Sequence, residues 1–143
     1  MKKYIFLIGA LLISAGLYAQ QKAPVSDLST QTVVNKFAKK YNLDNEQKDK
    51  MTKIQERRLR NLSEIINLES SNPGKFIQKK EAINSGTEVS IKMMLNKEQR
   101  ALYDKDRIAI RLKKAEKTKE LKKQGMTPEE MKPYLIAIDD EQY

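Results

Sequence analysis

Residues 43–47 read Leu-Asp-Asn-Glu-Gln, and residues 95–99 read Leu-Asn-Lys-Glu-Gln. Each pentapeptide combines a leucine, a short polar residue and a glutamine, and each precedes a long charged segment with periodic apolar residues. Asp44 and Asn96 suit the cap position of a helix, and the glutamine three residues later can accept a hydrogen bond from the cap's own N–H. The repetition therefore predicts two equivalent helical units.

The residues around the two pentapeptides predict an all-α fold, a small bundle of about four long amphipathic helices. The expected helices cover residues 28–41, 44–70, 73–94 and 96–124. Lys48 and Arg100 stand where a hydrophobic staple would place an apolar partner for each leucine. We therefore expect the two leucines to pack elsewhere in the molecule.

Short local signals mark the helix boundaries. The dipeptide Asn72-Pro73 fits a helix restart, and Gly125 fits a C-terminal cap. The dipeptide Ser85-Gly86 weakens the middle of the third helix and predicts a kink there. Thr127 begins another short helix, which we expect Pro133 to interrupt.

The second and fourth helices carry apolar faces of different kinds. In the second helix, Arg58 falls within the apolar arc, so its stem should lie on apolar surface while its charged end reaches water. The fourth helix carries two apolar stripes on different sides, which are Ala101, Ile108, Leu112 and Ala115 on one side and Tyr103, Ile110 and Leu121 on the other. A helix with two apolar faces needs two partners, and the second partner could be another chain.

The first residues predict export. Residues 1–19 place two lysines before an apolar run and small residues, as a secretory signal peptide does. A membrane anchor is the rival interpretation, for which the run is short. The predicted organisation is a signal peptide (1–19), a flexible arm (20–27), one helical domain (28–125) and a tail with a short helix (126–143). Export would place the protein in the periplasm or, further out, in the medium.

The tail holds an apolar run, residues 134–138, ahead of three consecutive acidic residues, Asp139, Asp140 and Glu141. Two outcomes are open for this segment. It either docks on the bundle or remains a mobile adhesive segment.

The net charge is +9. Basic charge often indicates nucleic acid, but an exported protein rarely meets it, so we expect no nucleic-acid partner. Anionic lipids and exported client proteins are the alternative partners. Equally, the charge could serve only to solvate long helices.

The residue types give no support for catalysis. His and Cys are absent from the sequence, which removes the commonest nucleophile–base pairs and transition-metal ligands. There is no glycine-rich phosphate loop. The sequence therefore predicts a protein that is not an enzyme and holds no cofactor or metal. Met93-Met94 suits Cu(I), but methionine at helical spacing more often fills a core.

The paired pentapeptides resemble the twin L-T-x-x-Q motifs of the Spy/CpxP family of small exported helical stress proteins. The resemblance covers about residues 43–106, and Asp44 and Asn96 stand where the family has threonine. The motif positions are Leu43, Asp44, Gln47, Leu95, Asn96 and Gln99. The resemblance implies an elongated, curved homodimer whose concave face is basic with apolar patches. It also implies an ATP-independent chaperone, or alternatively an adaptor of an envelope-stress sensor kinase. Some relatives bind zinc through histidines, which this chain lacks.

Face and charge suggest which residues would bind an unfolded client. Lysines and arginines would steer the client to the surface, and apolar side chains would hold it. The charged candidates are Arg57, Arg58, Arg60, Arg107, Arg111 and Lys114, and the apolar candidates are Met51, Ile54, Met93, Met94 and Ile110. The leading hypothesis is a holdase-type chaperone for unfolded envelope proteins. A dedicated envelope adaptor, or a small exported helical protein with some other role, remains the alternative.

Overall fold

The structure is a computed structural model that describes residues 25–143, with side-chain surroundings from residue 29 onward. The predicted signal peptide and residues 20–24 of the predicted arm lie outside the described residues. The described part is all α-helix, as predicted, and contains six helices. They are α1 (Val25–Tyr41), α2 (Asn45–Ile65), α3 (Leu68–Ser71), α4 (Pro73–Met94), α5 (Lys97–Lys123) and α6 (Pro128–Asp140). Helix α1 thus begins before the expected position 28.

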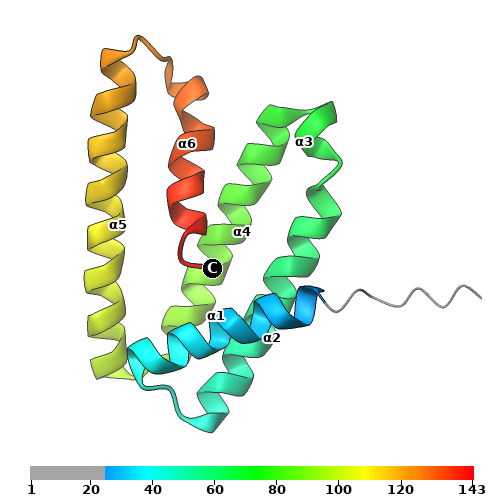
Figure 1. Ribbon diagram of the computed structural model, residues 1–143, viewed down its shortest axis with the longest axis vertical. Coiled ribbons are helices and arrows are strands. Elements are labelled where there is room, and N and C mark those ends of the chain that lie inside the picture. The colour runs from blue at the N-terminus through cyan, green and yellow to red at the C-terminus, as the bar shows by residue number, and fades with distance from the viewer. Residues whose placement is uncertain (1–24) are drawn as a thin grey trace, which may run out of the picture.

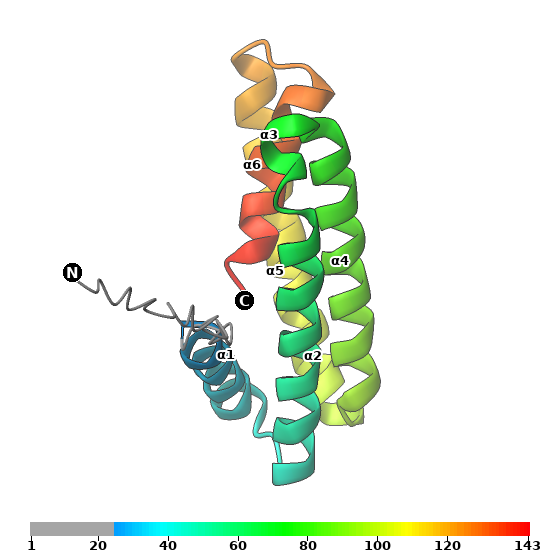
Figure 2. The same cartoon turned by 90° about the vertical axis from the view of Figure 1, so that its right-hand side faces the viewer.

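The helices form two antiparallel hairpins. One hairpin joins α2 to α4 through the single turn of α3, and the other joins α5 to α6 (Figure 1). These long helices run along the long axis of the molecule. Helix α1 crosses them near the end where α2 and α5 begin, and Figure 2 shows that it stands to one side of the others. The two hairpins diverge toward the opposite end (Figure 1).

The apolar core lies at the end where α1 crosses. Its buried members are Val33, Val34, Phe37, Tyr41, Leu43, Met51, Ile54, Ile91, Leu95 and Tyr103. The rings of Phe37, Tyr41 and Tyr103 contact one another at centroid distances of 5.4–6.5 Å, with tilted or edge-on planes. Burying a side chain of this size contributes about 1.5–3 kcal/mol, so α1 is an integral part of the fold.

The predicted helix boundaries at three places are confirmed. The Asn72 side chain accepts from the backbone N–H of Lys75 at the start of α4. Gly125 has a φ of 80° and ends α5, while the N–H of Met126 reaches back to the carbonyl of Leu121. This pattern is a Schellman motif. Thr127 forms a capping box with Glu130 at the start of α6.

The predicted second helix is interrupted earlier than expected. Helix α2 ends at Ile65, and a turn at residues 66–67 separates it from α3. Ile65 is buried, whereas Ile66 is 53% exposed. The apolar stripe therefore loses its packing partners at this point, and Asn67 is a poor residue for a helix interior. Without packing, the long helix that periodicity predicted does not continue.

The helices do not break at two positions where the sequence predicted irregularities, a kink at Ser85-Gly86 and an interruption at Pro133. Helix α4 runs continuously through Ser85 and Gly86, and Gly86 lies on an exposed side. Helix α6 continues through Pro133. A proline removes the hydrogen bond to the carbonyl four residues back, here that of Glu129. Pro133 and Glu129 are both exposed, so water can satisfy that carbonyl.

Candidate functional site

The two pentapeptides meet each other in space. The side-chain amides of Gln47 and Gln99 form a reciprocal pair, with Nε2–Oε1 distances of 2.7 and 2.9 Å. Each glutamine also closes its own capping box. The Gln47 Oε1 accepts from the N–H of Asp44 at 3.2 Å, and the Gln99 Oε1 accepts from the N–H of Asn96 at 3.0 Å. We call these four residues the glutamine clasp.

The clasp also holds the loops beside it. The Gln47 Nε2 donates to the carbonyl of Met94 at 3.0 Å, and the Gln99 Nε2 donates to the carbonyl of Asn42 at 3.1 Å. Leu43 and Leu95 are buried in the core on either side. All six predicted motif residues therefore assemble at one place, where they join the starts of α2 and α5. The two glutamines of the clasp are buried, while Asp44 and Asn96 are exposed, and the clasp serves the fold.

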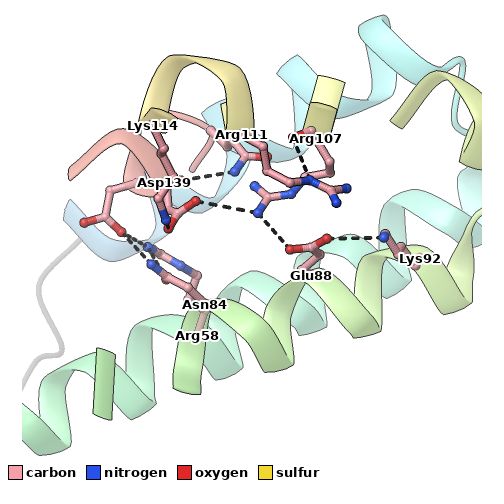
Figure 3. A network of polar contacts seen from close by, with 10 residues as sticks. Arg58, Asn84, Glu88, Lys92, Arg107, Arg111, Lys114 and Asp139 are labelled. Atoms are coloured by element: carbon pink, nitrogen blue, oxygen red, sulfur yellow. Dashed lines mark hydrogen bonds and ion pairs between the residues drawn. The ribbon is translucent and has the colours of Figure 1, made fainter. Parts of the chain in front are cut away.

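Several basic residues face the inside of the molecule and pair with the end of the described chain. We call residues 139–143 the acidic segment. The residues that pair with it form the inner basic cluster, which we define as Arg58, Lys80, Arg107, Lys113 and Lys114. Figure 3 shows Arg107 between Asp139 and Glu88, with Lys114 beside Asp139.

Most ion pairs between the two are short, and Arg107 approaches Asp139 less closely, at 3.6 Å. Asp140 accepts from Arg58 Nη2 at 2.8 Å through one carboxylate oxygen and from Lys80 Nζ at 2.6 Å through the other. Asp139 accepts from Lys114 Nζ at 2.6 Å. Lys113 pairs with the carboxylate of Glu141. Every acidic side chain of the segment therefore has a cationic partner.

An aromatic ring completes the contact. The ring of Tyr143 stacks on Phe37, with centroids 6.5 Å apart and planes within 6°. The guanidinium of Arg58 lies 4.4 Å from the centroid of the same ring. Burial lowers the pKa of Arg58, while Asp140 acts in the opposite direction. Arg58 is thus a buried cation that the acidic segment compensates from two sides.

Four of the predicted client-binding residues are inaccessible in this fold. Met51 and Ile54 lie in the core beneath α1. Arg58 has only 7% of its side chain exposed and is paired with Asp140. Arg107 has 11% exposed and donates to Glu88 at 2.8 Å. The expectation that the head of Arg58 reaches water is wrong, because the acidic segment covers it.

The other predicted client-binding residues are accessible to different degrees. Lys114 is about one-third exposed and is paired with Asp139, as described above. Met94 and Ile110 are partly buried, and Met94 packs against the core. The exposed candidates are Arg57, Arg60, Met93 and Arg111.

The exposed sides of α4 and α5 lie on the same face. Lys92 of α4 pairs with Asp104 of α5, with an Nζ–Oδ1 distance of 3.0 Å. On each helix, the residues to one side of this bridge are fully buried, as Ile91 and Tyr103 are. The residues to the other side are exposed. Because the core contains α1, the exposed sides form a face that is turned away from α1.

One part of this outer face combines cationic and apolar side chains. We define the outer patch as Arg57, Arg60, Val89 and Met93. Val89 is 56% exposed and Met93 is 78% exposed. The guanidinium of Arg57 donates to Ser90 Oγ at 2.6 Å, next to both of these side chains on α4. Sequence reasoning missed Val89, because a single apolar residue outside the main stripe gives no signal of its own.

A second part of the outer face is the unpartnered stripe of α5. We define the α5 strip as Ala101, Ile108, Leu112 and Ala115, all exposed. Ile108 is 52% exposed and Leu112 is 61% exposed. The opposite stripe of the helix contacts the rest of the molecule, with Tyr103 and Leu121 fully buried. The predicted division of α5 into two apolar faces is confirmed.

Within residues 25–143, no group of three or more acidic side chains is placed to hold a metal ion. None of the helices in this range is long and apolar enough to cross a membrane. No protein-family model, curated protein or solved structure matches the chain.

Proposed function

We propose that this chain is an exported, ATP-independent chaperone of the holdase type, which binds unfolded envelope proteins. The observation that carries the proposal is the outer patch. Val89 and Met93 lie one helical turn apart on α4 and are both exposed, and Arg57 of α2 reaches the same helix, so apolar and cationic groups adjoin there. The sequence resemblance to an exported chaperone family points in the same direction.

The outer patch suits a mobile, unfolded client. Arg57 and Arg60 add long-range attraction for acidic stretches of a client chain. Met93 adds a flexible apolar contact that adapts to many side chains. Each contact is weak, so a client would exchange rapidly and could fold while it remains near the surface.

The α5 strip favours self-association as the second element of the proposal. Two copies of α5 that cross antiparallel about the middle of the helix would bury Ile108 and Leu112 of both chains. The same arrangement would bring Lys105 of one copy near Glu116 of the other, because both residues border the strip at nearly equal distances from that middle. We infer a homodimer in which the outer patches remain free.

The test is the aggregation of a chemically denatured, unrelated protein, followed by light scattering with the purified chain present and ATP absent. We expect suppression near stoichiometric ratios, and we expect salt to weaken it because the charged contacts are exposed. No suppression at several-fold excess would contradict the chaperone proposal. The adaptor of a single folded envelope partner, such as the external domain of a sensor kinase, would then be the preferred function.

A charge-reversal pair locates the activity. The variant R57E/R60E removes the two exposed cations of the outer patch and leaves the buried, ion-paired Arg58 intact. The matched control K75E/K132E makes the same change in net charge at exposed lysines outside the patch. We expect R57E/R60E to lose most of the suppression and the control to keep it. Equal behaviour of the two variants would place the client elsewhere.

A further inference from the structure

The acidic segment is bound in the way an external peptide would be bound. Its carboxylates pair with side chains from α2, α4 and α5, and its aromatic ring contacts α1 and α2. The Lys36 Nζ, in α1, donates to the backbone carbonyls of Glu141 and Gln142 at 3.0 and 3.1 Å. Charge, ring and backbone are therefore all recognised, which amounts to a complete peptide-binding arrangement.

The site is larger than the segment that fills it. A cavity of about 430 Å³ remains between α4, α5 and the segment, and residues from all three line it. Its lining includes Glu81, Ser85, Arg111, Gln142 and Tyr143. Arg111 is exposed there, and its Nε donates to the carbonyl of Arg107. A longer stretch would have space and a further cation, Arg111, to contact, and Glu81 and Glu88 would restrict its acidic residues to the α5 side of the cavity.

The segment is held mainly by charges at the edge of the fold. Glu141 keeps 59% of its side chain exposed, and Asp140 keeps 28%. Partly exposed ion pairs contribute little individually, and the one apolar anchor of the segment, Tyr143, packs at the margin of the core. A segment at the end of a helix belongs to the part of a protein that opens more easily than its core. Opening of this segment would uncover the inner basic cluster and remove the Tyr143 ring from Phe37, while the buried core residues keep their contacts with one another.

We propose that the inner basic cluster is a docking site for acidic peptide segments that carry an aromatic residue, and that residues 139–143 occupy it as a built-in competitor. The external ligand would be an acidic stretch of an unfolded client, so this part rests on the proposed function. The occupation of the site by residues 139–143 does not depend on the proposed function. A tethered competitor acts at a high effective concentration, so only ligands of the same chemistry would displace it.

The test uses a fluorescent, N-acetylated Asp-Asp-Glu-Gln-Tyr peptide, whose binding is measured by anisotropy. The variant D139N/D140N/E141Q keeps the shape and ring of the segment but removes its charge. The matched control E56Q/E64Q/E69Q removes three negative charges from exposed positions elsewhere. We expect the segment variant to bind the peptide about tenfold more tightly than the wild-type chain, because its site is open for a larger fraction of the time.

The control variant should bind like the wild-type chain, and a neutral Asn-Asn-Gln-Gln-Tyr peptide should bind to none of the three proteins. Equal affinity of wild type and segment variant for the acidic peptide would overturn the proposal. So would equal binding of the acidic and neutral peptides. Circular dichroism checks that each variant keeps its helices.

A measurement on the unaltered chain guards against misfolding of the variant. Saturating acidic peptide should accelerate amide hydrogen exchange in residues 139–143 at least severalfold and leave exchange at the clasp unchanged. Unchanged exchange in the segment would overturn the proposal. Aggregation of a denatured protein, run in parallel, separates the two ideas. If no protein suppresses aggregation while the peptide results hold, the chaperone function fails and the docking site stands.

Discussion

At the scale of single residues, the two clasp glutamines show how a short sequence signal acquires a long-range role. Each amide takes part in four hydrogen bonds, two of them with the other glutamine. The two bonds between the glutamines are buried, where an unsatisfied group would be costly, and the other four are partly buried. The glutamine of each pentapeptide therefore forms hydrogen bonds both with the start of its own helix and with the glutamine of the other pentapeptide.

Replacing Gln47 by alanine should reduce the free energy of unfolding by about 2–3 kcal/mol, because the substitution also removes the two hydrogen bonds that the Gln99 amide makes with Gln47. The double variant Q47A/Q99A should lose about 1 kcal/mol less than the sum of the single variants. Urea unfolding followed by circular dichroism measures both. The exposed Gln124, whose side chain bonds only to Glu120, provides the control as Q124A. Additive losses at the clasp would show that the two glutamines act independently.

Three buried or partly buried tyrosines should limit the stability of the fold at alkaline pH. Burial raises the pKa of Tyr41, Tyr103 and Tyr143 above the ordinary value of about 10. A raised pKa in the folded state means that the unfolded chain loses its tyrosine protons first. Stability is thus complete below pH ~10 and falls as the pH rises beyond it. Above that pH, we expect the ultraviolet absorbance of tyrosinate to rise while the helical circular dichroism signal falls in parallel. The variant Y134F removes the exposed tyrosine from the signal. Ionisation of Tyr41, Tyr103 and Tyr143 at pH ~10 with the helices intact would contradict the burial of these rings.

At the scale of elements, the sequence predicted most of what is local and little of what is not. The caps at Asp44, Asn96 and Thr127 depend on neighbours three residues away, and all three form as expected. The end of α2 depends on whether Ile66 finds a packing partner, which no local pattern records. Continuity through Pro133 likewise depends on the exposure of Glu129.

The candidate site was harder to predict than the helices. Periodicity assigns Met51, Ile54 and Arg58 to one face of a helix but does not say what covers that face. The structure covers it with α1, the preceding helix, and with the acidic segment, which is distant in sequence. The α5 strip was predictable because one helix carried two apolar stripes. The pairing of Asp140 with Arg58 was not predictable, because 82 residues separate them.

Two glycines, Gly125 and Gly86, should respond to alanine substitution with changes in stability of opposite sign. Gly125 has a φ of 80°, where a Cβ is strained, whereas Gly86 lies in a helix with open space around it. The substitution G125A should destabilise the protein by about 1–2 kcal/mol. The substitution G86A should stabilise it by about 0.5–1 kcal/mol. Urea midpoints at an unchanged m-value measure both changes. Shifts of the same sign would contradict one of the two assigned backbone conformations.

At the scale of the whole molecule, the proposed dimer gives a direct prediction. The substitution L112E places a charge in the middle of the α5 strip and should convert the dimer to a monomer in sedimentation velocity. The control I66E alters an equally exposed apolar residue at the end of α2 and should leave the dimer intact. A wild-type chain that sediments as a monomer at the concentrations used in the chaperone assay would contradict the dimer.

The clasp reverses the usual pattern of fraying. Helix ends are normally the first places where backbone amides exchange with water. Here the first turns of α2 and α5 are tied together next to the core, across 52 residues of sequence. The turns at α3 and at Gly125 lie at the opposite end, where the hairpins diverge. Local opening should therefore begin at that distant end, and backbone amides should exchange most slowly at the starts of α2 and α5.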